Sequence, residues 1–253
     1  MQDTQFDLTG QTAFVTGGLG LIGRAVCKAL SGAGAKAIAL EPSPATKEFE
    51  SMPVVEFDAA HGDDLDQRLS GLESDHGAAT VWVNCAYPKT TDWGQSRPDD
   101  LDPEDWTRNV DLQLNSQCLI STAVAKRMAS GAGGSIITVG SIYGTVGADF
   151  AVYDGTDMML PPAYAAIKGG IHNYTRYLAS YFGSKGVRVN AVCPGGIADG
   201  QPDRFVQNYN ARVPMARMAD ADEIGGPVVF LASPAASYVT GTTLMVDGGW
   251  TAI

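Results

Sequence analysis

Short apolar runs alternate with segments of helical spacing along almost the whole chain, and this alternation limits the possible folds more than any other feature. The helical patterns are clearest over residues 21–30, 104–130, 161–183 and 222–232. The apolar runs cover residues 12–16, 37–40, 54–57, 80–83, 135–139, 187–192 and 243–246. Continuous apolar runs of this length are typical of parallel strands that helices cover on both faces. The sequence therefore predicts an α/β fold with a doubly wound parallel sheet of about seven strands.

Length and composition support one folded domain. The chain has 253 residues, of which 45% are hydrophobic, enough for a sizeable core and too many for a disordered chain. No linker, repeat or low-complexity stretch interrupts it, so we expect a single domain over residues 1–253. The formal net charge is −11, which disfavours binding to nucleic acid or to an anionic membrane surface.

Cysteine spacing and the absence of targeting patterns suggest a compartment. No pair of cysteines forms a CxxC motif and no histidine lies at ligand spacing, so we expect free thiols, no metal site and a reducing environment. Residues 1–7 lack the basic and apolar regions of a signal peptide, and no run of 18 apolar residues occurs. We therefore expect a cytoplasmic protein. The cysteines and histidines that show no ligand spacing are Cys27, Cys85, Cys118, Cys193, His61, His76 and His172.

A glycine-rich loop joins the first predicted strand to the first predicted helix. It reads Thr16-Gly-Gly-Leu-Gly-Leu-Ile-Gly23. Glycines in this position let the backbone approach a pyrophosphate, and the following helix N-terminus supplies free N–H groups and a positive dipole end. The placement between strand and helix favours a dinucleotide site over a tight turn without a ligand. The predicted cofactor contacts in this loop are Gly17, Leu19, Gly20, Ile22 and Gly23.

Polar residues at the ends of later strands extend the predicted cofactor site. Glu41 ends the second strand, where a carboxylate binds both adenosine ribose hydroxyls and repels a 2′-phosphate. No lysine or arginine lies in the glycine loop or at 42–46, so we predict NAD rather than NADP. Asp58, with Ala59, is placed to meet the adenine, or it forms a plain turn. Ala86 is a further predicted cofactor contact, and Asn84, two residues before it, either touches the ligand or joins neighbouring strand ends.

Tyr164 and Lys168 form a Y-x-x-x-K pattern on a predicted helix. Positions i and i+4 share a helix face, and a nearby ammonium lowers the pKa of a phenol. A phenolate can then accept the proton of a substrate alcohol while hydride leaves the carbon. Ser141 follows the strand at 135–139, whose carboxyl end faces the same cleft, so its hydroxyl is placed to hold the substrate oxygen. The sequence predicts these three residues as catalytic.

Two further motifs complete a resemblance that extends along essentially the whole chain. They are Pro194-Gly-Gly-Ile197 and Val246-Asp-Gly-Gly249. With the glycine loop and the Ser–Tyr–Lys set, the sequence resembles the single-domain branch of the short-chain dehydrogenase/reductase family. The resemblance implies a Rossmann fold, a nicotinamide cofactor bound also by Pro194 and Ile197, and a homo-tetramer or homo-dimer. The segments Asn84-Cys-Ala-Tyr-Pro88 and Gly248-Gly-Trp-Thr-Ala252 are similar to flagellin-modification oxidoreductases of amino-sugar pathways.

The chain departs from the family pattern at several positions. Its loop reads T-G-x-x-G-x-x-G, with Leu21 in place of the middle glycine. Tyr87 replaces a family glycine, which puts an aromatic ring at the pocket wall. The family's catalytic asparagine, which kinks a helix and holds a relay water, corresponds here to Gln113. Asp199 stands where the family has a threonine near the cofactor amide.

Two segments are predicted to shape the substrate pocket. The first, residues 149–160 ("the insertion"), is longer than in most relatives of this kind and is rich in carboxylates and phenols. The second, residues 198–214 ("the lid"), falls where the family has its substrate lid. A solvated loop or subunit contact is an equal reading of the insertion, and surface ion pairs are an alternative for the lid arginines. The predicted substrate residues are Tyr87, Tyr143, Tyr153, Asp199 and Arg204.

These observations lead to one preferred function and two alternatives. We expect an NAD-dependent oxidoreductase that interconverts a secondary alcohol and a ketone, acting on a small polar sugar, sugar phosphate or polyol. A cofactor-binding regulatory or structural subunit is the first alternative, and the substitutions at Gln113 and Asp199 favour it. A reductase of acyl or steroid carbonyls is the second, for which an apolar lid would be expected.

Overall fold

A computed structural model describes residues 4–60, 62 and 64–253, so His61 lies outside the described part. Within it the strands form one sheet in the order β3-β4-β2-β1-β5-β6-β7-β8, and every neighbouring pair except β3 and β4 is parallel. The strands are β1 (Thr12–Thr16), β2 (Lys36–Glu41), β3 (Glu48–Phe49), β4 (Met52–Glu56), β5 (Val81–Asn84), β6 (Gly134–Val139), β7 (Val187–Pro194) and β8 (Thr243–Val246).

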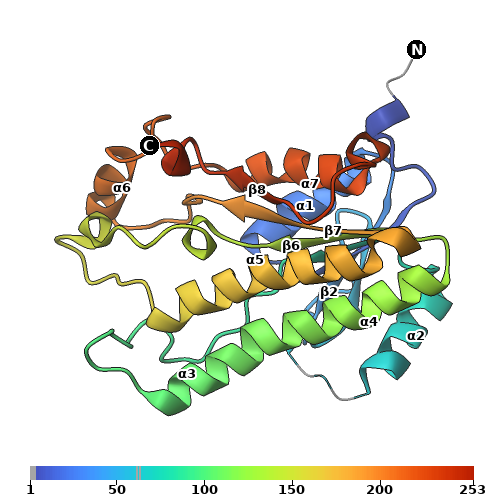
Figure 1. Ribbon diagram of the computed structural model, residues 1–253, viewed down its shortest axis with the longest axis horizontal. Helices are drawn as coiled ribbons and strands as arrows, with labels where there is room; N and C mark the ends of the chain where they lie inside the picture. The colour runs from blue at the N-terminus through green and yellow to red at the C-terminus, as the bar shows by residue number, and fades with distance from the viewer. Residues whose placement is uncertain (1–3, 61, 63) are drawn as a thin grey trace.

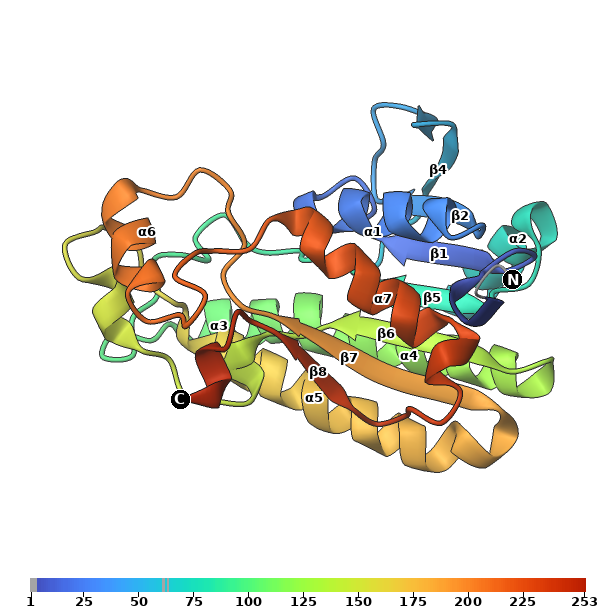
Figure 2. The same ribbon diagram turned by 90° about the horizontal axis from the view of Figure 1, so that it is seen from above.

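Helices cover both faces of this sheet (Figures 1 and 2). One face carries α1 (Leu21–Gly32) and α7 (Gly225–Ala232). The other carries α2 (Leu65–His76), α4 (Ser116–Ser130) and α5 (Pro162–Phe182). The three-layer arrangement is the doubly wound fold that the alternating pattern predicts.

Strand β1 explains why the strands read as continuous apolar runs. Ala13 and Val15 point into the core beneath α1 and α7, whereas Phe14 points to the opposite core and packs 5.8 Å from the Trp82 ring. Alternate residues of a strand face opposite sides of the sheet, so burial of both faces removes every polar position. The sequence pattern is thus a direct result of the two helical layers.

Several elements differ from the sequence-based expectation. The short strand β3 pairs antiparallel with β4 at the sheet edge. Helix α2 has no predicted counterpart, because Leu69 and Leu72 are its only buried side chains among the described residues. The helix expected over 104–130 consists of α3 (Pro103–Val110), a π-helical segment (Asp111–Asn115) and α4. Helix α6 (Asp203–Asn210) lies within the segment expected to be a lid.

The strand order reverses between β1 and β5, and this reversal determines where a ligand-binding crevice forms. The connections from β1 and β5 leave toward opposite faces, which opens a crevice at the carboxyl ends of the central strands. None of the described helices has the length and apolar character needed to cross a bilayer.

Candidate active site

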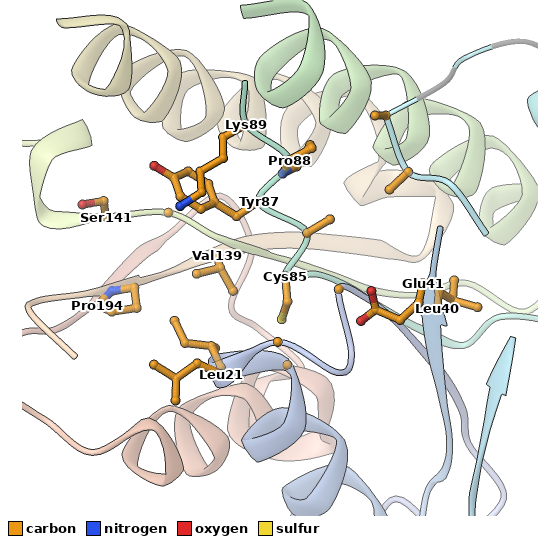
Figure 3. Close-up of a pocket in the computed structure, with 18 of the residues that line it drawn as sticks. Leu21, Leu40, Glu41, Cys85, Tyr87, Pro88, Lys89, Val139, Ser141 and Pro194 are labelled. Carbon is orange, nitrogen blue, oxygen red and sulfur yellow. The ribbon is translucent and has the colours of Figure 1, made fainter. Parts of the chain in front are cut away.

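A cleft of ≈ 630 Å³ opens at the carboxyl ends of β1, β2, β5, β6 and β7 (Figure 3). This volume lies within the usual range for small-molecule and cofactor sites. In the close-up, Glu41 lies at one end and Ser141 at the other, with Tyr87 and Lys89 on the Ser141 side. The sequence-predicted residues that line the cleft are Gly17, Gly20, Ile22, Gly23, Glu41, Asp58, Ala59, Ala86, Tyr87, Ser141, Tyr164, Lys168, Pro194 and Ile197.

The glycine loop forms a tight cradle in which two glycines leave no room for a side chain. Gly17 has φ +64°, and a Cβ atom there would lie 2.8 Å from the Ala86 backbone. A Cβ atom on Gly23 would lie 2.0 Å from the Gly17 carbonyl oxygen. Helix α1 follows with Gly20 as a cap that has no side chain, so its first N–H groups face the cleft edge unshielded. This arrangement fits a dinucleotide pyrophosphate.

Glu41 binds the loop as well as lining the cleft. Its Oε1 accepts a hydrogen bond of 2.6 Å from the Leu19 N–H. Leu19 itself packs against the core beneath α1, so it contributes this N–H and does not line the cleft. Asp58 lines the cleft while its Oδ1 accepts a bond of 2.8 Å from the Ala60 N–H, which is the turn geometry that the sequence analysis left open.

Tyr164, Lys168 and Ser141 meet at one end of the cleft. Tyr164 and Lys168 share one face of α5, and the Lys168 Nζ lies 5.6 Å from the Tyr164 ring centroid and donates to the Val139 carbonyl at 2.9 Å. Burial lowers the pKa of Lys168 to about 8, so the ammonium still predominates at neutral pH. Burial also raises the pKa of Tyr164, and the Ser141 hydroxyl opposes that rise. The pKa of Tyr164 is therefore raised, where the sequence analysis expected Lys168 to lower it, and desolvation of the buried phenol is the main cause.

His172 is a site residue that the sequence analysis assigned no role. It lies one turn beyond Lys168 on α5 and is buried. Its Nε2 accepts from the Ser141 N–H at 3.4 Å, and its Nδ1 lies 3.2 Å from the Thr145 hydroxyl. Burial lowers the pKa of His172 to about 4, which keeps the ring neutral and the nitrogen able to accept. The spacing of Tyr164, Lys168 and His172 at i, i+4 and i+8 is a signal that could have identified it.

Asn84 does not line the cleft, and its assignment as a cofactor contact needs correction. Its Oδ1 accepts from the Trp82 indole N–H at 2.8 Å, and its Nδ2 donates to Ser121 at 2.9 Å and to Thr138 at 3.3 Å. These bonds join β5 to α4 and β6. Asn84 therefore connects neighbouring elements beneath the site, the second of its two sequence-based readings.

Gln113 occupies the π-helical segment between α3 and α4 and also lies outside the cleft lining. Its side chain is buried, and neither amide atom makes a hydrogen bond within the described part of the chain. One turn later, Gln117 donates to the Ala86 carbonyl at 3.1 Å and so supports the cleft wall from behind. The helix interruption that the family resemblance implies is present at this position.

The insertion and the lid contact each other instead of lining the cleft. Asp149 forms an ion pair of 2.6 Å with Arg212, so its carboxylate is already satisfied. Asn208 on α6 donates to the carbonyls of Val152 at 3.2 Å and Asp154 at 2.9 Å. The polar pocket expected from the insertion carboxylates is thus not formed by Asp149.

The remaining predicted substrate residues lie around this contact. The Tyr153 ring is 5.5 Å from Phe205 of α6, and Tyr143 is buried edge-on against Trp250 at 6.4 Å. Arg204 is exposed beside Gly155 of the insertion, and Asp199 is exposed at the start of the lid. None of the four lines the cleft, because the aromatic rings fill the space between insertion and lid.

Comparison with known proteins agrees with this geometry. The family model described as Enoyl-(Acyl carrier protein) reductase matches residues 20–251. The 2-dehydro-3-deoxy-D-gluconate 5-dehydrogenase of Pseudoalteromonas atlantica is 32% identical, over 97% of this chain and 98% of its own. The post-translational flagellin modification protein A of Campylobacter coli is 29% identical, over 96% and 99%.

A solved structure is similar over the same length. The short chain dehydrogenase of Leptospira borgpetersenii, crystallised with bound NAD+, has a TM-score of 0.87 and 29% identity, and the match covers 99% of this chain and 96% of that one. Family model, relatives and fold thus agree with the glycine cradle and the Ser–Tyr–Lys set. The chain belongs to the short-chain dehydrogenase/reductase family, and it is an NAD(P)-dependent oxidoreductase of that family.

Proposed function

We propose that the protein is an NAD-preferring dehydrogenase that interconverts a secondary alcohol and a ketone on a small polyhydroxylated substrate. The observation that carries the proposal is the layout of one cleft. Ser141, Tyr164 and Lys168 line one end, and Glu41 lies at the other beside the glycine cradle. Glu41 supports the preference for NAD, because a carboxylate at the ribose end repels a 2′-phosphate.

Each catalytic side chain has a distinct task in this proposal. When bound, the nicotinamide ring supplies the hydride acceptor or donor. The Ser141 hydroxyl holds the substrate oxygen, while the Tyr164 hydroxyl exchanges a proton with it. The Lys168 ammonium, held at the Val139 carbonyl, stabilises the negative charge that develops on the Tyr164 oxygen. His172 holds the Ser141 backbone in place from below.

The shape of the lid supports a small polar substrate over a long acyl chain. Phe205, Tyr209 and Trp250 pack on one another and on the insertion in a closed apolar cluster. The polar groups of Ser141, Tyr164, Lys89 and Lys168 remain at the Ser141 end of the cleft, among apolar side chains such as Val139 and Pro194. The gluconate-derivative dehydrogenase among the relatives acts on such a polyhydroxylated molecule, as its name states.

The catalytic assignment is tested by removing one hydroxyl. We expect Tyr164→Phe to abolish turnover of alditols, aldonates and sugar phosphates with NAD, while calorimetric titration shows nearly unchanged NAD affinity. Tyr238→Phe, the same change at a fully exposed tyrosine away from the cleft, is the matched control and should retain activity. Retained turnover in Tyr164→Phe would exclude the mechanism. Absence of turnover in the wild-type protein, with NAD binding intact, would favour a regulatory subunit.

We also propose that the protein self-associates in the cytoplasm. Leu119 on α4 and Tyr177 and Tyr181 on α5 expose more than half of their surface, so the two helices present an apolar face. An exposed apolar patch of this kind is typical of a subunit interface. The four cysteines are free thiols, as suits a reducing compartment. Sedimentation of the purified protein tests the assembly, and a monomer at micromolar concentration would contradict it.

A further inference from the structure

The charged side chains of the cleft are separated by sign. Four of the described residues that line it are acidic or basic. Glu41 and Asp58 lie at the end beside the glycine cradle, whereas Lys89 and Lys168 lie at the end with Ser141 and Tyr164. In a chain with a net charge of −11, a cleft end with two ammonium groups and no carboxylate is a local exception.

The mechanism uses Lys168 but leaves Lys89 without a task. Among the residues that the structure describes, Lys89 forms no ion pair, and its one recorded contact places its Nζ 5.8 Å from the Tyr87 ring centroid. The Lys168 Nζ lies 5.7 Å from the same ring. Figure 3 shows the Lys89 side chain over Tyr87, with its amine toward the Ser141 end of the cleft. The two ammonium groups therefore flank one ring beside the reacting atoms.

The segment that carries Lys89 is firmly held. Thr90 donates through its N–H to Asn109 at 3.2 Å and through its hydroxyl to Asp105 at 2.9 Å, and both partners are buried on α3. On the other side, the Tyr87 hydroxyl accepts from the Trp93 indole at 2.7 Å. A charge on a fixed backbone beside a cleft loses less freedom on binding a ligand than one on a loose loop.

We propose that Lys89 recognises a carboxylate of the substrate, and that the substrate class is the sugar acids. This inference rests on the proposed function and narrows it from polyhydroxylated molecules to polyhydroxylated anions. An extended sugar acid can place its carboxylate at Lys89 and a hydroxyl-bearing carbon at Ser141 and Tyr164. Because Lys168 serves Tyr164 in the reaction, the Lys89 ammonium alone is left to balance the substrate anion; it matches one carboxylate, whereas a phosphate dianion would bring a second, unbalanced charge into a strongly acidic protein. Sugar phosphates are thus the disfavoured anions.

The test compares substrates that differ by the carboxylate alone. An aldonate and the alditol of equal length and configuration are assayed with the wild-type enzyme and with Lys89→Met. We expect the ratio of kcat/KM for aldonate over alditol to fall about tenfold in the variant, mainly through KM, as for loss of one charge-assisted hydrogen bond. Lys89→Arg should recover most of the ratio. The aldonate KM of the wild type should also rise with ionic strength more than the alditol KM.

Control measurements distinguish carboxylate recognition by Lys89 from a general charge effect, from an effect on the cofactor and from failure of the proposed function. Lys126→Met makes the same change of net charge on the exposed side of α4 and should leave the ratio unchanged. An unchanged ratio in Lys89→Met, or a rise in the KM for NAD instead, would overturn the assignment. Turnover of alditols but of no aldonate would overturn it and leave the proposed function intact. Preference for a sugar phosphate over the aldonate would overturn the choice of carboxylate. Turnover of no member of the panel would instead reject the proposed function.

Discussion

Glu41 combines a structural and a selective task in a single carboxylate. One oxygen accepts the Leu19 N–H and so ties the glycine loop to the end of β2. The charge of the same group faces the cleft. A truncation at this position would therefore change the loop and the electrostatics together, and the two effects have to be separated by the choice of variant.

The replacement Glu41→Gln separates them. The glutamine keeps a carbonyl oxygen for the Leu19 N–H but removes the negative charge, so repulsion of a 2′-phosphate disappears. We expect the kcat/KM ratio of NADP to NAD to rise about tenfold, with the melting temperature nearly unchanged. Glu41→Ala should raise the same ratio and also lower the melting temperature. A ratio that stays constant in both variants would show that Glu41 does not select the cofactor.

At the scale of elements, the π-helical segment holds a buried amide that makes no hydrogen bond within the described chain. An unsatisfied buried amide costs folding free energy, and this residue stands where the family resemblance implies a side chain that holds a relay water. We expect Gln113→Leu to raise the free energy of unfolding in urea by about 1 kcal/mol and to lower kcat. Gln117→Leu, which removes a formed bond to Ala86, should instead destabilise the protein. Equal effects of both variants on stability would contradict this view.

The predictability of each element follows from how much of it is buried. Strands such as β1 are apolar on both faces, and the sequence pattern locates them. Helix α2 has only two buried side chains among the described residues, and β3 has only two residues. Neither element therefore leaves a periodic apolar pattern in the sequence. In the site, Tyr164 and Lys168 are recognisable because they share a helix face. Lys89 has no such signal, since an exposed lysine on a loop reads alike whether or not it faces a cleft.

At the scale of the whole molecule, buried thiols make stability depend on alkaline pH. Burial raises the pKa of Cys118 to about 11 and those of Cys27 and Cys193 to about 12, and it raises the pKa of Cys85 as well. Unfolded thiols ionise near pH 9, so above that pH the folded chain binds more protons and its stability falls. Lys168, with its lowered pKa, acts in the opposite sense between pH 8 and 10.5, whereas buried tyrosines with raised pKa, Tyr164 among them, add to the loss of stability above pH 10.

We therefore expect the free energy of unfolding, measured in urea with a reductant, to fall between pH 9 and pH 10.5. Each thiol ionised only in the unfolded chain contributes about 1.4 kcal/mol per pH unit. Cys27→Ala should reduce the slope by about that amount. A free energy that stays level or rises over this range would show that the thiols do not control the alkaline limb.

The link between insertion and lid has a consequence for how these two segments move. The ion pair of Asp149 with Arg212, the Asn208 bonds and the Tyr153–Phe205 contact join residues that lie 52 to 63 positions apart in the chain. The two segments together form one unit that is connected to the sheet twice, by the insertion after β6 and by the lid after β7. A proteolytic cut in one of the two segments therefore leaves it attached through its contacts with the other. A displacement of α6 is expected to move the insertion with it.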